Sequence, residues 1–372
     1  MHIIKNENLK NHILIDHTLI INEIERSIKF YNWDFILSFL PSGSFLVGGY
    51  IRDIILGRLT SAIDVDIVVP RNAIEIGKKI TCNSQGKLII LDKDREVVRI
   101  IFDHITIDIA SQISSSIQID LSTRDFSINA IAFSFEEKLL IDPLNGIKDI
   151  QISLLRTYSK QNLIDDPLRI LRCFRFVAEL NFNIDENLKH FVKKYKNKLS
   201  IVAKERINYE LQRIIRGERA IKSILLINKF KIFNYIQSEK NLIFNDLEKI
   251  NFAEFNHFEK AKFMPLFFLV QILDEVSLKE FKFSKSEISN IKLLRKWKLI
   301  LNRKTIYELN EKERFDLHRE LETILPCFIF SLPQELQIDW LSRWRNKDDK
   351  LFHPSNLIKG DVIKNYLKIK DG

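Results

Sequence analysis

The sequence predicts an α+β protein in which a small mixed sheet with helices is followed by a long all-helical part. Short β-branched runs separated by turn-like breaks occupy the stretch from residue 45 to 135, whereas the later chain places apolar residues at helical spacing. The chain also has only 10 Gly and 8 Pro in 372 residues, which argues against a loop-rich all-β fold.

Five segments follow from this change of pattern. Residues 1–24 are read as a lead-in, and residues 25–150 contain the sheet, preceded by the helical pattern INEIERSIKFYNWDFILSFL. The predicted strands are IDVDIVV, GKLIIL, EVVRIIF and ITIDIA. Soft boundaries near 150, 216 and 300 divide the helical part into residues 151–216, 217–300 and 301–372.

Composition indicates a globular protein of the cytoplasm. The net charge of +9 and the pI of 9.2 suit a polyanionic partner, although a basic protein need not have one. Cys82, Cys173 and Cys327 are too far apart for a zinc site or a disulfide framework, so we expect buried thiols. No apolar run reaches the roughly 18 residues that span a bilayer, and the N-terminus lacks a signal-peptide pattern. Neither a membrane nor an obligate protein partner is indicated.

The run IDVDIVV places two carboxylates on one face of a predicted strand. Asp64 and Asp66 are two residues apart, and they repel each other unless a cation such as Mg²⁺ lies between them. Taken alone, the pattern more often marks a solvated strand edge. Asp108 in ITIDIA is either a third carboxylate from a neighbouring strand or an ordinary exposed acid.

A glycine turn precedes these aspartates. Gly48 and Gly49 open a predicted helix, where backbone N–H groups can approach an anion at the positive end of the dipole. Arg52 follows one turn later as a charged clamp, next to Asp53. A phosphate site beside a metal-binding aspartate pair is the equipment of nucleotidyl transfer.

Two later stretches carry further polar candidates. In TRDFSINAIAF, Arg124 suits a triphosphate or ribose, and Asp125 and Asn129 suit a sugar or the backbone, although a helix cap would look similar. In DDPLRILRCFRF, Pro167 suits a helix start, and Asp166 and Arg169 share a predicted helical face able to read a base edge. The alternative is a surface ion pair. Arg172 and Arg175 continue the basic stripe.

The segment after residue 189 is rich in basic side chains. They either contact RNA phosphates or form a solvated helix face. The candidates for RNA binding are Lys193, Lys194, Lys204, Arg206, Arg213 and Arg216.

The chain resembles the class II tRNA nucleotidyltransferase/poly(A) polymerase family. The motifs that carry the resemblance are, in chain order, LVGGYIRDIILGRLTSAIDVDIV, TRDFSINAIAF, DPLNGIKDI, DDPLRILRCFRF and ERINYELQRII. The resemblance covers roughly residues 45 to 216. It implies a polymerase-β-like nucleotidyltransferase head followed by a helical neck, body and tail. It also implies template-independent addition of CMP and/or AMP, from CTP and/or ATP, to a tRNA or other RNA 3′ end with release of pyrophosphate.

The resemblance also assigns roles. It implies that Asp64 and Asp66 hold Mg²⁺ in a two-metal site, that Gly49 and Arg52 bind the triphosphate, and that Arg124 and Asp125 contact sugar and phosphates. It further implies that a pair on the neck selects C or A through a Watson–Crick-like edge, with two more arginines nearby; these residues are Asp166, Arg169, Arg172 and Arg175.

The chain departs from the family pattern at several positions. Thr123 stands where an arginine is usual, Asp165 replaces a glutamate, and Ser127 replaces a threonine. The segment between Asp108 and Arg124 is shorter than the flexible loop of full CCA-adding members. This shortening favours a CC-adding or A-adding enzyme, or a poly(A) polymerase acting on general RNA. A catalytically degenerate RNA-binding member is the remaining alternative.

Overall fold

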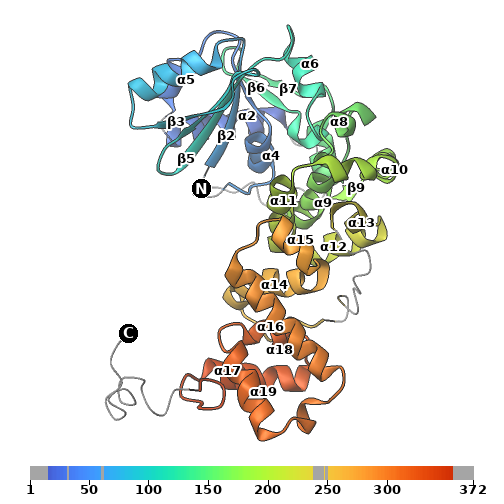
Figure 1. The fold of residues 1–372 in the computed structure, drawn as a ribbon. Helices are drawn as coiled ribbons and strands as arrows, with labels where there is room; N and C mark the ends of the chain where they lie inside the picture. Colours follow the sequence, from blue (N-terminus) through green and yellow to red (C-terminus); the bar gives the residue numbers. More distant parts are fainter. Residues whose placement is uncertain (1–15, 32, 60–62, 238–246, 248–249, 355–372) are drawn as a thin grey trace, which may run out of the picture. The chain divides into compact units, whose positions relative to one another are not determined.

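The computed structural model describes residues 16–31, 33–59, 63–237, 247 and 250–354 (Figure 1). The chain divides into two compact units, one ending at Leu199 and the other beginning at Ser200. The finer division into head, neck, body and tail stays a prediction.

The first unit is built on a mixed seven-stranded sheet, as the sequence predicts. Its strand order is β3-β4-β5-β2-β1-β6-β7; β2 and β5 are parallel, and the other neighbours are antiparallel. The strands are β1 (Phe45–Val47), β2 (Ile63–Val69), β3 (Lys87–Asp92), β4 (Val97–Ile101), β5 (Ile105–Ser111), β6 (Ala132–Ser134) and β7 (Leu140–Ile141).

Helix α5 packs over β3, β4 and β5, whereas α4 packs on β1 and β2. A Cβ on Gly77 of α5 would lie 2.8 Å from Val98, and Val98 pairs with Ile109 of β5. Since successive side chains of a strand point to opposite faces, Asp108 lies on the face away from α5. The helices and 3₁₀ turn here are α2 (His17–Phe30), α3 (Asp34–Leu37), α4 (Gly49–Ile55), α5 (Ala73–Cys82), α6 (Ile117–Ser122), η1 (Ser127–Asn129) and α7 (Gly146–Gln151).

Helix α2 begins inside the predicted lead-in. The side chain of Asp16 accepts the Thr18 N–H, which caps the helix, and Ile20 and Ile24 are fully buried. The helical pattern therefore starts earlier than the sequence indicates; the rest of the predicted lead-in, residues 1–15, lies outside the described residues.

Beyond residue 151 the first unit is mainly helical but contains a small parallel β8–β9 pair. Helices alone were predicted here, so these two-residue strands are a difference from the prediction. The elements are β8 (Leu154–Leu155), α8 (Lys160–Asp165), α9 (Arg169–Leu180), β9 (Asn183–Ile184), α10 (Glu186–Tyr195) and the 3₁₀ segment η2 (Lys196–Ile201), which runs across the unit boundary.

The described elements of the second unit are helices, as predicted. Helix α14 contacts α11, α16 and α18, and its long apolar run is correspondingly buried on several sides. The elements are α11 (Lys204–Arg216), α12 (Ala220–Lys229), α13 (Phe233–Ile236), α14 (His257–Ile272), α15 (Glu275–Glu280), α16 (Lys285–Leu301), η4 (Ile306–Glu308), α17 (Glu311–Leu321), α18 (Leu325–Ile329) and α19 (Gln334–Arg345).

The cysteines and the hydrophobicity of the helices were also predicted from the sequence. Cys173 and Cys327 are buried free thiols as expected, but Cys82 is exposed because it ends α5 at the surface, so the prediction is wrong for that residue. Within the described residues, the helices are too short or too polar to cross a bilayer.

Candidate active site

The predicted strand aspartates lie on one face of the sheet. In β2, Ile63, Val65 and Ile67 are buried, while Asp64 is exposed and Asp66 is half-buried on the opposite face. Asp66 is level with Asp108 of the parallel neighbour β5, and with Val47 of β1. The register therefore brings three acidic residues to neighbouring positions at the centre of the sheet, next to the turn that follows β1.

The charges around Asp66 are unbalanced. Burial raises the pKa of Asp66, the neighbouring Asp108 and Asp64 raise it further, and Arg124 acts in the opposite direction. A divalent cation would relieve this repulsion, and carboxylate oxygens are the ligands that Mg²⁺ prefers, so Asp64 and Asp66 fit the ion. In the described part of the chain, no group of three or more His, Cys, Asp or Glu side chains is arranged around one metal position.

Asp108 is held by an arginine that the sequence analysis missed. Arg99 of β4 lies opposite Asp108 in the register and donates to both of its carboxylate oxygens, at 2.7 Å each. These hydrogen bonds raise the pKa of Arg99. The alternation of side chains along β4 puts Arg99 on the same face of the sheet as Asp108. The sequence does not reveal that β4 and β5 pair, so this contact could not be predicted from it. A role for Asp108 as a third metal carboxylate stays a prediction.

Gly48 has a structural role that the sequence does not reveal. Its N–H donates to the Ile131 carbonyl at 3.0 Å, and the approach of an anion to this turn stays a prediction. Its φ of +80° suits glycine, and a Cβ there would lie 3.1 Å from Arg124 Nη1 and 3.2 Å from Asp66 Oδ2. The glycine makes room for two side chains of the site. Gly49 begins α4, as predicted.

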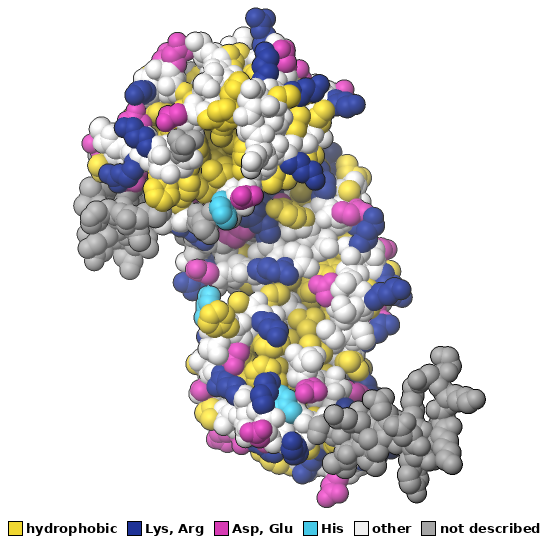
Figure 2. All heavy atoms as spheres, turned by 90° about the vertical axis from the view of Figure 1, so that its left-hand side faces the viewer, with side chains coloured by type: hydrophobic (Ala, Val, Ile, Leu, Met, Phe, Trp, Pro, Cys, Tyr) yellow, Lys and Arg dark blue, Asp and Glu magenta, His cyan; other side chains and the backbone are white. Residues whose placement is uncertain are grey.

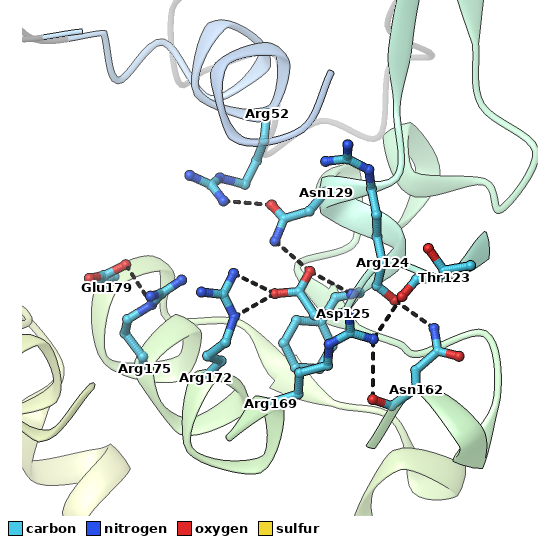
Figure 3. Close-up of polar contacts among 11 residues, drawn as sticks. Arg52, Thr123, Arg124, Asp125, Asn129, Asn162, Arg169, Arg172, Arg175 and Glu179 are labelled. Atoms are coloured by element: carbon cyan, nitrogen blue, oxygen red, sulfur yellow. Dashed lines mark hydrogen bonds and ion pairs between the residues drawn. The ribbon is translucent and has the colours of Figure 1, made fainter. Parts of the chain in front are cut away.

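Arg52 is fixed on both sides. Its Nε and Nη2 donate to the carboxylate of Asp53 at 2.9 Å each. Its Nη1 donates to Asn129 Oδ1 at 2.6 Å (Figure 3). The ring of Phe176 lies 5.2 Å from the guanidinium carbon. Asp53 and Asn129 therefore orient Arg52, and its contact with a triphosphate stays a prediction.

Asp125 links the sheet to α9. One oxygen accepts from the Phe126 N–H at 2.8 Å and Asn129 Nδ2 at 3.0 Å; the other accepts from Arg172 Nε at 2.8 Å and Nη2 at 2.6 Å. Burial opposes the charged form, but the Arg172 guanidinium and the hydrogen bonds outweigh it, so the pKa of Asp125 lies well below its usual value. This buried carboxylate orients two polar side chains, and a contact with sugar stays a prediction.

Helix α9 begins later than predicted. Asp166 has extended backbone and Arg169 is the first helical residue, so the two do not share a helical face, contrary to the prediction. Pro167 restricts the preceding residue to extended backbone, which explains the later start. Asp166 instead lies in the turn before the helix, where its carbonyl accepts the Arg169 N–H at 3.0 Å.

The three arginines of α9 have distinct surroundings. Arg169 Nη1 donates to the carbonyls of Thr123 and Asn162, and Arg172 pairs with Asp125. Arg175 is buried, with Nε 3.7 Å from Glu179 (Figure 3). The guanidinium of Arg175 lies over the ring of Phe176, which meets the ring of Phe126 edge to face. Sequence spacing predicted the arginine stripe, but it gave no signal for Phe176 or Asn162.

The predicted RNA-binding residues fall in both units. Lys193 and Lys194 are exposed on α10 of the first unit. The others lie on α11 of the second unit: Arg206, Arg213 and Arg216 are exposed, whereas Lys204 is half-buried and donates to the Ile236 carbonyl. Figure 2 shows Lys and Arg side chains interspersed with Asp and Glu on the visible face. A continuous basic RNA surface stays a prediction.

Comparisons with known proteins support this description. Residues 44–156 match the poly(A) polymerase head domain, and residues 181–241 match the probable RNA and SrmB-binding site of polymerase A. A CC-adding tRNA nucleotidyltransferase of Synechocystis is 30% identical over 90% of this chain and 87% of its own. A CCA-adding enzyme of Staphylococcus epidermidis is 26% identical over 73% of this chain and 67% of its own.

The fold also matches a solved structure. The Thermotoga maritima CCA-adding enzyme, complexed with tRNA_CCA, superposes with a TM-score of 0.66. It is 24% identical and covers 95% of this chain and 92% of its own. This similarity confirms the predicted sheet-containing head followed by helices.

Proposed function

The chain belongs to the tRNA nucleotidyltransferase/poly(A) polymerase family, and we propose that it adds CMP, without a template, to the 3′ ends of tRNA to build the CC sequence. CTP is then the nucleotide substrate, tRNA the acceptor and pyrophosphate the second product. A single observation carries the choice of CC: a relative that is 30% identical over 90% of this chain and 87% of its own is named a CC-adding enzyme.

The connection between β5 and α6 supports this choice. Strand β5 ends at Ser111 and α6 begins at Ile117, so only residues 112–116 join them. Gln112 donates to the carbonyls of Val69 and Ser114, which holds the connection close to the sheet. The resemblance associates a longer flexible loop here with the switch from CTP to ATP. A short, hydrogen-bonded connection favours an enzyme that does not make that switch.

In the proposed reaction the RNA 3′-hydroxyl loses its proton to solvent, and its oxygen attacks the α-phosphorus of CTP. The new phosphodiester forms as the bond to the β-phosphate breaks, and the pair of electrons leaves with pyrophosphate. Mg²⁺ held by Asp64 and Asp66 would supply charge stabilisation for the attacking and leaving oxygens. Arg52 and Arg124 bind and orient the triphosphate, and Gly48 keeps room for Arg124 beside Asp66.

Selection of the base is assigned to the N-terminal end of α9. Arg169 offers donors and Asp166 offers acceptors at the start of this helix, and both types are needed to read cytosine. Asp125 holds Arg172 in place beside them. This assignment does not require the two selecting residues to share a helical face, because the turn at Asp166 brings its backbone next to Arg169.

Incorporation of labelled CMP into a tRNA that lacks its CCA end tests the proposal. The wild-type protein should incorporate CMP with Mg²⁺, whereas Asp64→Ala should incorporate none and still bind the tRNA. Asp94→Ala, an exposed aspartate in the β3–β4 turn, is the matched control and should behave as wild type. A wild-type protein that bound tRNA without incorporating any nucleotide would favour the RNA-binding alternative. Long tails of AMP on unrelated RNA would favour the poly(A) polymerase.

A further inference from the structure

A buried side-chain amide contacts the backbone of residues 122–124, which also accepts from Arg169. Asn162 of α8 is 5% exposed, and its Nδ2 donates to the carbonyls of Ser122 at 2.9 Å and Arg124 at 2.5 Å. Its Oδ1 accepts from Ser159 Oγ at 2.9 Å. Both hydrogens of the amide are therefore used on backbone that belongs to a different segment of the chain.

The same segment holds Arg169. The carbonyl of Thr123, between the two carbonyls bound by Asn162, accepts from Arg169 Nη1 at 2.7 Å. The backbone carbonyl of Asn162 accepts from the same nitrogen at 3.1 Å (Figure 3). Asn162 thus contributes one of the two acceptors of Arg169 directly and fixes the peptide planes that carry the other.

The side chains of this segment point toward the other parts of the site. Arg124 reaches the space beside Gly48 and Asp66, and the next residue, Asp125, binds Arg172. A shift of the peptide planes at 122–124 would therefore move two side chains together: Arg124, which binds the triphosphate, and Arg169, which donates to the Thr123 carbonyl and selects the base. Asn162 lies at the position that prevents such a shift.

We propose that Asn162 is a positioning residue for nucleotide selection, acting by fixing the guanidinium of Arg169. This inference rests on the proposed function. The two carbonyls occupy Nη1, so Nε and Nη2 are the Arg169 donors left to face the base. Cytosine and adenine present different donors and acceptors at one position, so the orientation of these N–H groups decides which base is bound well.

Asn162→Asp is the test substitution because it keeps the shape and replaces Nδ2, with its two N–H donors, by a carboxylate oxygen that repels the carbonyls. Gln337→Glu is the matched control: Gln337 is a buried amide of the second unit that donates to the carbonyls of Phe330 and Leu332. Both variants should lower the unfolding temperature. Asn162→Asp should also lower the ratio of kcat/KM for CTP over ATP by about tenfold or more, the worth of one good base contact. The control should leave that ratio unchanged.

A double-mutant cycle separates positioning from general destabilisation. The ratio of Kd values for CTP and ATP, measured by equilibrium dialysis, should change on Asn162→Asp in the wild type and not in an Arg169→Ala background. Additive changes would overturn the inference, as would an unchanged CTP/ATP ratio in Asn162→Asp. Should Asn162→Asp fail to fold, Asn162→Ser, which retains a single donor, should show the same pattern at smaller amplitude.

The experiment also distinguishes this inference from the proposed function. A wild-type protein that incorporates no CMP would refute the proposed function and the inference with it. A wild-type protein that prefers CTP, together with an Asn162→Asp variant that prefers it equally, would refute the inference alone.

Discussion

Substitution of Gly48 by alanine perturbs the backbone and two side chains of the site at once. Gly48 has φ +80° and ψ −130°, a region that residues with a side chain rarely adopt, and this strain costs roughly 1–3 kcal/mol. The added Cβ would lie 3.1 Å from Arg124 Nη1 and 3.2 Å from Asp66 Oδ2, so both side chains must move by a few tenths of an ångström. Because a displacement of 1 Å costs about a hundredfold in rate, we expect kcat to fall roughly tenfold.

Gly43→Ala is the control for this prediction. Gly43 also has positive φ, +77°, but a Cβ there would contact only Pro70 Cγ at 3.4 Å among the described residues. Chemical denaturation and CMP incorporation should be measured for both variants. Both should lose stability, and only Gly48→Ala should lose the additional factor in kcat. Equal activity of the two variants would refute the assignment of Gly48 to the space beside Asp66 and Arg124.

Three further substitutions test the packing around the site and in the second unit. Asp125→Asn should cost about 3 kcal/mol in urea unfolding above pH 4, because it removes the carboxylate that pairs with Arg172. The pKa of Asp125 lies below its usual value, so the wild type loses this contribution only as the pH falls further. Equal stability of the variant and the wild type would contradict the ion pair. Gly146→Ala should destabilise by about 3 kcal/mol, because the Cβ would lie 2.1 Å from the Ser127 carbonyl oxygen; a shift in midpoint within error would contradict that close approach. Burial lowers the pKa of His318 from 6.5 to about 4, so the unfolded chain binds a proton before the folded chain does as the pH falls. Between pH 6.5 and about pH 4, the stability of the wild type should therefore decrease by about 3 kcal/mol more than that of His318→Gln. Parallel pH profiles of wild type and His318→Gln would show that the imidazole is not buried in its neutral form.

Local sequence pattern was sufficient for the centre of the site. Alternation along IDVDIVV predicted that Asp64 and Asp66 share a face, and β2 has this geometry. The run ITIDIA predicted a second strand, and the structure pairs it in register with the first, so Asp108 lies beside Asp66. Such features depend on the period of a strand and on burial, which neighbouring residues in the sequence determine.

Contacts between residues far apart in the sequence could not be predicted in the same way. The sequence shows an arginine at position 99 and an asparagine at 162, but not that they contact Asp108 and the 122–124 backbone. Nor does the sequence indicate that the Gly48 N–H donates to the Ile131 carbonyl, because nothing local shows that β6 lies beside β1 in the sheet. In each case the missing information was strand order or tertiary contact, which single-sequence patterns do not contain.

The central claim is tested most directly by supplying CTP or ATP separately to three tRNA transcripts, ending before the first C, before the second C and before the terminal A. The CC-adding assignment predicts that CTP extends the first transcript by two nucleotides and the second by one, and that ATP extends none of them. Extension of the third transcript by AMP would contradict the assignment and identify an A-adding or full CCA-adding enzyme.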